Sequence, residues 1–351
     1  MSTRQLRVLF LPPQAMLGYR AAHTPGSGPD PRDMEQLLAA QGIDLVTIDP
    51  TGRPFNPLAG RHPMLEGMDL WRALRVMLFE RHADLVVSVN DGAAAPLILL
   101  RRLFGFRVPI VLVDLSPAER WRIRRRVQDF VIPRLDGVLV VPSSQVAYIA
   151  QRWSNSVPVE VVGVLIDTDF FRPTADPPGD YIFSIGQDRG RDFPTLLAAM
   201  DNVPADLWLR TSRQLPPETA TMKNVRLLRE RVDDRQLRDL YGGCRFVVAP
   251  LSETANANGV STIQEAGAMA KALIVTENPA IRDFIVPDET CLMVPRHDVA
   301  AMRGAILRLL DDPGLCERLG RNARRFAEET CSLAPYALRF GAALRRFAST
   351  A

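Results

Sequence analysis

The stretch DPRDMEQLLAAQGIDLVTI, residues 30–48, and the apolar run LRVLFL at residues 6–11 before it set out a strand, a helix and a second strand. Asp30 and Pro31 are the residue types that open helices, as N-cap and as first helical residue, and apolar residues then recur at helical spacing. Gly42 suits the left-handed backbone conformation in which many helices end. The stretch therefore predicts a βαβ unit, the building block of parallel sheets.

The same alternation of short apolar runs and helical segments continues along the chain. The runs are hydrophobic throughout, as parallel strands are when helices cover both faces of the sheet. Strands are expected at residues 6–11, 43–48, 83–89, 108–114, 137–142, 159–164, 181–186, 205–211, 225–229, 245–250, 272–276 and 291–295. Helices in the second half are expected to begin near Asp192, Asp234, Ser261, Ile281, Val299 and Pro313. The pattern predicts an α/β protein with doubly wound parallel sheets.

A cluster of prolines and a glycine in RPTADPPGD, residues 172–180, interrupts this alternation. Such a composition is typical of a linker. We therefore expect two Rossmann-like domains, at residues 1–172 and 173–332, and a C-terminal helix at 333–351 that packs back on the first domain. Because open parallel sheets bind ligands beyond the carboxyl ends of their strands, the site is expected in a cleft across which the two domains face each other.

The composition excludes several classes of protein. A net charge of +3 over 351 residues is too small for a general polyanion binder, so no nucleic-acid partner is expected. No apolar run is long enough for a signal peptide or a membrane span. The four cysteines lie far apart, without the spacing of a metal site. We expect a cytoplasmic protein with reduced thiols and no bound metal.

The segment NANGVSTIQEAGAMAKALIVT, residues 256–276, contains the strongest indication of chemistry. A glycine loop opens a helix near Ser261, and the free N–H groups of a helix N-terminus favour an anion. Ser261 and Thr262 add hydroxyl donors, and the carboxylate of Glu265, one turn further, can accept hydrogen bonds from a diol such as ribose. The alternative is that Ser261 only caps the helix and Glu265 only lies in its first turn.

This segment resembles the nucleotide-sugar signature of family 4 retaining glycosyltransferases (glycosyl transferases group 1), which have the two-domain GT-B fold. The matches, in chain order, are IDTDFFRP (166–173), YIFSIGQDRGRDFPTLLAAM (181–200), LRDLYGGCRFVVAPLSET (237–254), Glu265-Ala266, Ala270 to Ala272, Leu273 to Thr276 and NPAIRDFI (278–285). The resemblance covers residues 159–330 in detail and the earlier part of the chain only in architecture. It implies an enzyme of the hexosyltransferase type that transfers sugar to a glycan, a lipid-linked or a small-molecule acceptor.

The resemblance also implies roles for particular residues. Glu265 inherits the carboxylate that binds the donor ribose, and Arg191 matches a basic residue that neutralises the diphosphate of the leaving nucleotide. Backbone amides of the glycine loop, from Asn258 to Val260, would hold the donor phosphates or sugar. Arg191, Glu265 and Asn258 are therefore the expected catalytic residues. The donor is expected to be a UDP- or GDP-sugar rather than an ADP-sugar, with no tightly bound cofactor.

Other donor-side candidates lie at strand ends and in the glycine loop. They are Gly186, Gln187, Arg189, Arg210, Thr211, Asn256, Gly259, Val260, Ser261 and Thr262. The chain departs from the family pattern at three points, one of which is that Gly259 lies six residues before Glu265 rather than five. Gln187 stands where an arginine is usual, although Arg189 could reach the same space. Ala257 replaces the first carboxylate of the E-x7-E motif, and Asn256 or Asn258 could hydrogen-bond the sugar instead.

In this fold the N-terminal domain supplies the acceptor site. The loop after the first strand, residues 12–30, is long and rich in Gly and Pro, as functional loops often are. Acceptor-side candidates are Gly18 and His23 in this loop and, at later strand ends, Asn90, Asp91, Asp114 and Ser116.

Residues 119–135, ERWRIRRRVQDFVIPRL, combine many arginines with an apolar stripe on one helical segment. Such a helix can lie on an anionic membrane surface, which would suit a lipid-linked acceptor. The alternative is a solvated basic face whose apolar stripe packs on the sheet.

Two other functions compete with the transferase. One is a degenerate glycosyltransferase-like protein that binds nucleotide-sugar without turnover, because a family carboxylate is missing. The other is a nicotinamide-dependent oxidoreductase, which is disfavoured because no G-x-G-x-x-G follows the first strand.

Overall fold

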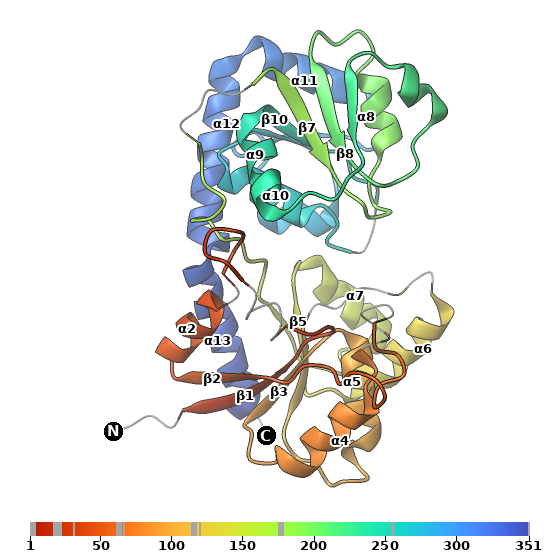
Figure 1. Ribbon diagram of the computed structural model, residues 1–351, viewed down its shortest axis with the longest axis vertical. Coiled ribbons are helices and arrows are strands. Elements are labelled where there is room, and N and C mark those ends of the chain that lie inside the picture. The colour runs from red at the N-terminus through yellow and green to blue at the C-terminus, as the bar shows by residue number, and fades with distance from the viewer. Residues whose placement is uncertain are drawn as a thin grey trace. The chain divides into compact units, whose positions relative to one another are not determined.

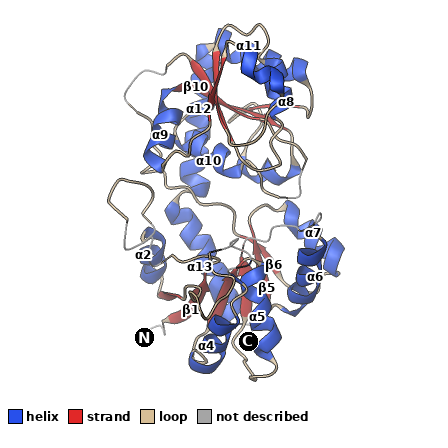
Figure 2. Cartoon of the chain, turned by 45° about the vertical axis from the view of Figure 1, so that its right-hand side comes forward, coloured by secondary structure: helices blue, strands red, loops and turns tan. Residues whose placement is uncertain are grey.

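The computed structural model describes residues 5–16, 23–30, 32–60, 65, 67–113, 118, 121–174, 179–253 and 256–349. The chain forms two compact units (Figures 1 and 2). The first unit comprises Met1–Thr24, Asp30–Gly163 and Tyr336–Ala351, and the second Pro25–Pro29 and Val164–Pro335. The division after Gly163 precedes the expected boundary at residue 172, so that residues 164–172 lie with the second unit.

The described part of the first unit contains a six-stranded parallel sheet in the order β2-β1-β3-β4-β5-β6. Its strands are β1 (Leu6–Leu11), β2 (Ile43–Thr47), β3 (Leu85–Val89), β4 (Ile110–Val113), β5 (Gly137–Val140) and β6 (Val159–Val161). Its helices are α2 (Asp33–Ala40), α4 (Leu70–Phe79), α5 (Asp91–Arg101), α6 (Arg122–Val131), a 3-10 turn (Ile132–Arg134), α7 (Ser144–Trp153) and α13 (Leu333–Ser349).

Helices cover both faces of this sheet, which explains why its strands are apolar throughout. Side chains of α4, α5, α6 and α7 pack in one hydrophobic core. Those of α2 and α13 pack in a second core on the opposite face. The ring of Phe347, from α13, lies directly over Gly137, where a Cβ atom would overlap it. The C-terminal helix is therefore part of the first unit.

One local prediction in the first unit is wrong. Asp30 does not cap α2, because the helix begins at Asp33 with Arg32 as its N-cap residue. The Asp30 carboxylate instead accepts hydrogen bonds from the backbone N–H and the guanidinium of Arg32. Pro31 lies outside the described residues. Gly42 has the expected left-handed conformation, with φ of +73°.

The described part of the second unit contains another six-stranded parallel sheet, in the order β12-β11-β10-β7-β8-β9. The strands are β7 (Tyr181–Ile185), β8 (Asp206–Arg210), β9 (Val225–Leu228), β10 (Cys244–Ala249), β11 (Leu273–Thr276) and β12 (Leu292–Val294). The helices are α8 (Phe193–Ala199), α9 (Asp234–Gly243), α10 (Val260–Ala268), α11 (Val299–Asp311) and α12 (Pro313–Phe326), with 3-10 turns at Pro217–Thr221 and Pro279–Phe284 and a π-helical turn at Ala327–Cys331.

The order of the second sheet fixes where a ligand can bind. The core on one face contains side chains of α8, α11 and α12. From β7 the chain continues outward through β8 and β9, and β10 then returns to the other side of β7. The carboxyl ends of β7 and β10 therefore flank a topological switch point, at which doubly wound sheets leave a crevice for ligands.

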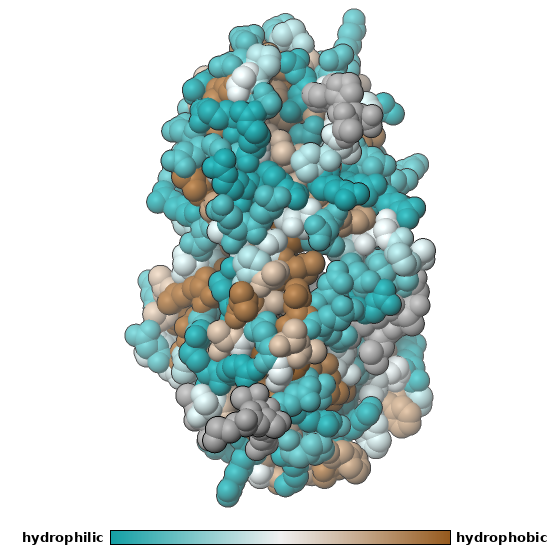
Figure 3. Space-filling model, turned by 90° about the vertical axis from the view of Figure 1, so that its left-hand side faces the viewer, coloured by the Kyte–Doolittle hydropathy of each residue, from teal (hydrophilic) through white to brown (hydrophobic). Residues whose placement is uncertain are grey.

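The surface in Figure 3 is mostly hydrophilic over the second unit, and apolar residues gather in patches over the first. No helix within the described ranges is both long enough and apolar enough to cross a membrane.

Candidate functional site

The loops that leave β7 and β10 lie side by side at the switch point. The backbone N–H of Asp192 donates to the carbonyl of Pro250 at 3.0 Å, and that of Ser252 donates to the carbonyl of Gly190 at 2.8 Å. Arg191 and Leu251 form an antiparallel bridge between the two loops. Backbone hydrogen bonds thus join residues that are about sixty positions apart, just N-terminal to α10.

Two glycines allow this close approach. Gly259, the N-cap residue of α10, has a φ of +85°, and a Cβ there would lie 2.7 Å from Cδ2 of Leu251. A Cβ at Gly190 would overlap the side-chain amide of Asn258. Because both positions exclude a side chain, the loop can turn tightly into α10, and the first N–H groups of such a helix favour an anion.

Arg191 is the main cation of this site, and its side chain is only 6% exposed. Its Nε donates to the carboxylate of Asp188 at 2.9 Å, and its Nη2 donates to Oγ1 of Thr262 at 3.0 Å. Gly186 leaves the space that the side chain of Arg191 occupies. The buried Nη1 has no hydrogen-bond partner among the described residues. A buried guanidinium nitrogen without an acceptor is costly, so the arrangement suits an anionic ligand.

Glu265 on α10 is bound by Tyr241 on α9. The hydroxyl of Tyr241, which is fully buried, donates to Oε2 of Glu265 at 2.8 Å. Burial raises the pKa of Glu265 to about 7, against the lowering effects of the Tyr241 hydrogen bond and the Arg191 charge. Burial and the Glu265 charge raise the pKa of Tyr241 well above its usual value. Glu265 can therefore change its ionisation near neutral pH.

A pocket of about 510 Å³ opens beside this cluster, at the carboxyl ends of β7 and β8. Its lining is Ile185, Gln187, Arg210, Ser212, Arg229, Arg231, Val232 and Leu237. The amide oxygen of Gln187 faces Nη2 of Arg210 at 3.0 Å, and its nitrogen faces the hydroxyl of Ser212 at 3.3 Å. Burial, followed by the neighbouring charge of Arg231, lowers the pKa of the Arg210 guanidinium. Because its lining includes Arg210, Arg229 and Arg231, the pocket is positively charged. Its volume is large enough for a small polar ligand.

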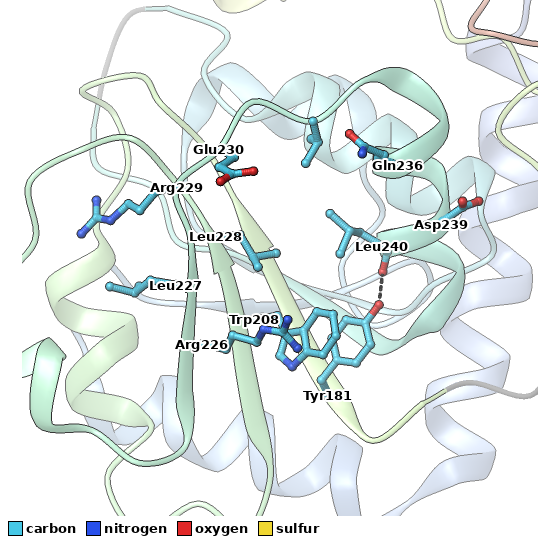
Figure 4. Close-up of a pocket in the computed structure, with 11 residues that line it drawn as sticks. Tyr181, Trp208, Arg226, Leu227, Leu228, Arg229, Glu230, Gln236, Asp239 and Leu240 are labelled. Atoms are coloured by element: carbon cyan, nitrogen blue, oxygen red, sulfur yellow. Dashed lines mark hydrogen bonds between the residues drawn. The ribbon is translucent and has the colours of Figure 1, made fainter.

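A second pocket, of about 720 Å³, shares Arg229 and Val232 with the first. Figure 4 shows its floor, where the rings of Tyr181 and Trp208 stack with centroids 4.0 Å apart. The hydroxyl of Tyr181 donates to the carbonyl of Leu240 at 2.7 Å, which ties β7 to α9. The two pockets adjoin each other at Arg229 and Val232.

The structure brings most of the predicted donor-side residues together, but with changed roles for some. Thr262 is buried and accepts from Arg191, so its hydroxyl supports that guanidinium. The side chains of Ser261, Gln187 and Arg189 are exposed. Thr211 is fully buried and accepts from the N–H of Arg213, so its side chain stabilises the turn after β8.

The missing carboxylate of the glycine loop is not replaced by Glu253. This residue is exposed and forms an ion pair with Arg296, which follows β12. Asn256 and Asn258 remain the polar residues of the loop, and both take part in interactions within the protein.

The acceptor-side prediction is wrong for one residue. Asp91 is 1% exposed and forms an ion pair with Arg124, at 2.8 Å, so this carboxylate is not open to a ligand. Asn90 accepts from the N–H of Ala93 and caps α5. His23 is partly buried. Gly18, Asp114 and Ser116 lie outside the described residues.

The basic segment at residues 119–135 forms α6 and the following turn, apart from residues 119 and 120, which are not described. Arg122, Arg125 and Arg126 are exposed, as is Ile123, which is 82% exposed. Arg124 is bound to Asp91 and faces the protein. The apolar stripe therefore packs inward only in part.

Two members of the site, Tyr241 and Asp188, are not among the residues that the sequence predicts. A signal for Asp188 exists in its position, three residues before Arg191 in a loop after a predicted strand. The contact of Tyr241 with Glu265 joins two helices and has no local signal.

Solved structures with the same fold cover nearly the whole chain. Sucrose-phosphate synthase from Thermosynechococcus elongatus has a TM-score of 0.73 and 18% identity, over 99% of this chain and 100% of that one. The Anabaena protein HepE in complex with UDP and glucose has a TM-score of 0.69 and 13% identity, over 97% and 99%. A glycosyltransferase from Rickettsia africae has a TM-score of 0.69 and 13% identity, over 99% and 100%. No curated protein matches the sequence.

These likenesses and the site at the switch point define the class: the chain has the GT-B fold, with two Rossmann-like units. Residues 191–312, which contain Arg191, Glu265 and the glycine loop, match the family described as "Glycosyl transferases group 1". Within that segment the chain is similar to group 1 glycosyltransferases, and over nearly its whole length it has their fold.

Proposed function

We propose that the chain is a retaining, family 4-type hexosyltransferase that takes its sugar from a UDP- or GDP-sugar. The observation that carries this proposal is Arg191, whose buried Nη1 lacks an acceptor among the described residues and lies beside the N-terminus of α10. A nucleoside diphosphate supplies acceptor oxygens for the guanidinium and for the N–H groups of the helix.

In the proposed mechanism the bond between the sugar and the diphosphate breaks, and negative charge grows on the departing oxygen. Arg191 and the helix N-terminus stabilise that charge more strongly in the transition state than in the ground state. The acceptor hydroxyl attacks the same face of the sugar, and its proton passes to the departing phosphate oxygen. The protein therefore contributes position and charge, and Glu265 holds the donor by its ribose.

The pocket beside Gln187 and Arg210 suits the base of the donor, since it adjoins the cluster at the end of β7. A uracil base is favoured because HepE, which has the same fold, forms complexes with UDP and with UDP-glucose. The acceptor is proposed to be a glycan or a lipid-linked sugar handled on the cytoplasmic side.

The first test is thermal stabilisation by UDP, GDP, ADP and their sugar conjugates. We expect one nucleotide to raise the melting temperature of the wild type, and Glu265→Ala to lose most of the shift because the ribose contact is gone. Glu317→Ala is the matched control, since Glu317 is an exposed carboxylate on α12 of the same unit. The absence of any shift in the wild type contradicts the proposal.

The degenerate, non-catalytic reading is favoured by one observation: Ala257 replaces a family carboxylate, and the nearby Glu253 is bound to Arg296. It predicts nucleotide-sugar binding without release of free nucleotide. Measuring nucleotide release from the donor, with and without simple sugar acceptors, distinguishes the two functions.

We propose further that α6 contacts an anionic membrane. Arg122, Arg125 and Arg126 are exposed beside Ile123, a combination that favours acidic headgroups and the interface below them. Flotation with anionic liposomes at low salt is expected to carry the wild type and to lose the triple Arg→Glu variant at these positions. The same triple change at Arg318, Arg321 and Arg325, on α12, is the control. Flotation that does not differ between the variants contradicts the contact.

A further inference from the structure

The two charged groups proposed to hold the donor, Arg191 and Glu265, are connected through the protein. Nη2 of Arg191 donates to Thr262, and the hydroxyl of Tyr241 donates to Glu265. The hydroxyl of Thr262 also acts on the pKa of Tyr241, which it lowers against the raising effects of burial and Glu265, so the two side chains are neighbours. Thr262 precedes Glu265 by three residues on α10, so the two side chains lie on the same side of the helix. The buried hydroxyls of Thr262 and Tyr241 therefore lie between the cation and the carboxylate, one bound to each.

We propose that Tyr241 is a positioning residue of the donor site, which keeps Glu265 in the ionised form that accepts both hydroxyls of a ribose. The inference rests on the proposed function. Tyr241 is fixed for this role, since it is fully buried and its ring meets Phe183 edge to face, with centroids 5.1 Å apart. A rigid donor directed at one carboxylate oxygen restricts the other oxygen to one orientation.

The charged groups that face Glu265 act in opposite directions. Tyr241 from α9 and Arg191 from the loop after β7 favour the carboxylate, whereas burial and the charge of Asp234, at the start of α9, favour the protonated acid. With the resulting pKa of about 7, the ionised and the protonated form of Glu265 are similarly populated at neutral pH. The pKa of Tyr241 is raised far enough that its hydroxyl stays a donor at neutral pH.

Removing the hydroxyl of Tyr241 removes one of the two groups that favour ionisation. The pKa of Glu265 must then rise, because its neutral form gains relative to its anion. Since ribose binding needs the anion, nucleotide affinity increases as the pH rises through that pKa. The midpoint of this increase is expected near pH 7 in the wild type and about one pH unit higher in Tyr241→Phe.

The experiment measures the affinity for the nucleotide found by thermal shift, by calorimetry between pH 6 and pH 9.5. Tyr241→Phe is expected to bind several-fold more weakly than the wild type at pH 7 and nearly as well at pH 9.5. Tyr181→Phe is the matched control, because its hydroxyl also makes one hydrogen bond within the second unit, to a backbone carbonyl. Its midpoint should equal that of the wild type. Glu265→Gln should bind weakly, without the alkaline rise.

A Tyr241→Phe midpoint equal to that of the wild type overturns the inference while leaving the donor site intact. A wild type that binds no nucleotide removes the proposed function and the inference with it. If Tyr241→Phe does not fold, Thr262→Val tests the same site, because Thr262 holds Arg191, the other group that favours ionised Glu265. It should shift the midpoint in the same direction, and Thr262→Ser, which retains the hydroxyl, should restore it. A midpoint unmoved in Thr262→Val overturns the inference.

Discussion

The side chain of Arg191 is fixed by the protein and still keeps a hydrogen-bond donor for a ligand. Its Nε and one N–H of Nη2 are held by Asp188 and Thr262, and Nη1 has no acceptor among the described residues, which leaves it for a ligand. The planar guanidinium can satisfy all three directions at once, whereas a lysine ammonium on a flexible stem cannot.

Arg191→Lys is therefore expected to keep the charge and lose the placement. We expect turnover to fall about 100-fold, as when one preorganised transition-state donor is removed, and nucleotide affinity to fall less. Steady-state kinetics and calorimetry measure the two effects. Arg321→Lys, at an exposed position on α12, should change neither. Wild-type turnover in Arg191→Lys would show that Nη1 does not contact the reacting phosphate.

The role of a single residue can be predicted from the sequence where its partners lie in the same segment of the chain. Gly259 and Glu265 could be identified because the loop and helix that contain them are continuous in sequence. The role of Thr262 could not, because it depends on Arg191, which comes from another loop. Asp91 was misjudged for a similar reason. Its ion pair with Arg124 joins α5 to α6, and nothing near Asp91 in the sequence indicates that partner.

The positions of strands and helices are predicted from the sequence more accurately than the contacts of single residues. Every predicted apolar run contains a strand, because strands buried on both faces leave an uninterrupted apolar signal. The segment near Ile281 forms a 3-10 turn rather than an α-helix. The turn is still capped like a helix, since Asn278 before it accepts from the N–H of Ala280 and Pro279 stands at its first position.

Packing between α10 and α12 depends on a glycine. A Cβ at Gly320 would overlap the carbonyl of Ala270, at the turn that ends α10, whereas a Cβ at Gly304 on α11 meets nothing within 4 Å. Gly320→Ala should destabilise the protein by about 1–3 kcal/mol through overpacking. Gly304→Ala should stabilise it by about 0.5–1 kcal/mol, because alanine loses less backbone entropy in a helix. Urea unfolding measures both changes, and equal stabilities would contradict the contact.

At the scale of the whole molecule, the two units differ in how they use the chain. The core of the second unit is built from a nearly continuous segment, residues 164–335, whereas the first unit needs residues from both ends of the chain. The proline-rich segment suggested a boundary at residue 172, but contacts and not composition define a unit, and residues 164–172 pack with the second one.

A fragment of residues 164–335 is therefore expected to unfold cooperatively and to bind the nucleotide, since Arg191, Tyr241 and Glu265 all lie within it. A fragment of residues 1–163 should lack cooperative unfolding, because Phe340, Leu344 and Phe347 of α13 are missing from its core. Circular dichroism during heating tests both fragments. Cooperative unfolding of the shorter N-terminal fragment would show that α13 is dispensable.

The position of Phe347 over Gly137 has a consequence for synthesis on the ribosome. When the first unit emerges, one face of its sheet lacks the helix that covers it, and that helix is translated last. At about 5–20 residues per second, the uncovered face waits on the order of ten seconds or more. In that interval the second unit can fold first, which reverses the usual N-to-C order. The nascent first unit is then a natural client for chaperones that bind exposed apolar surface.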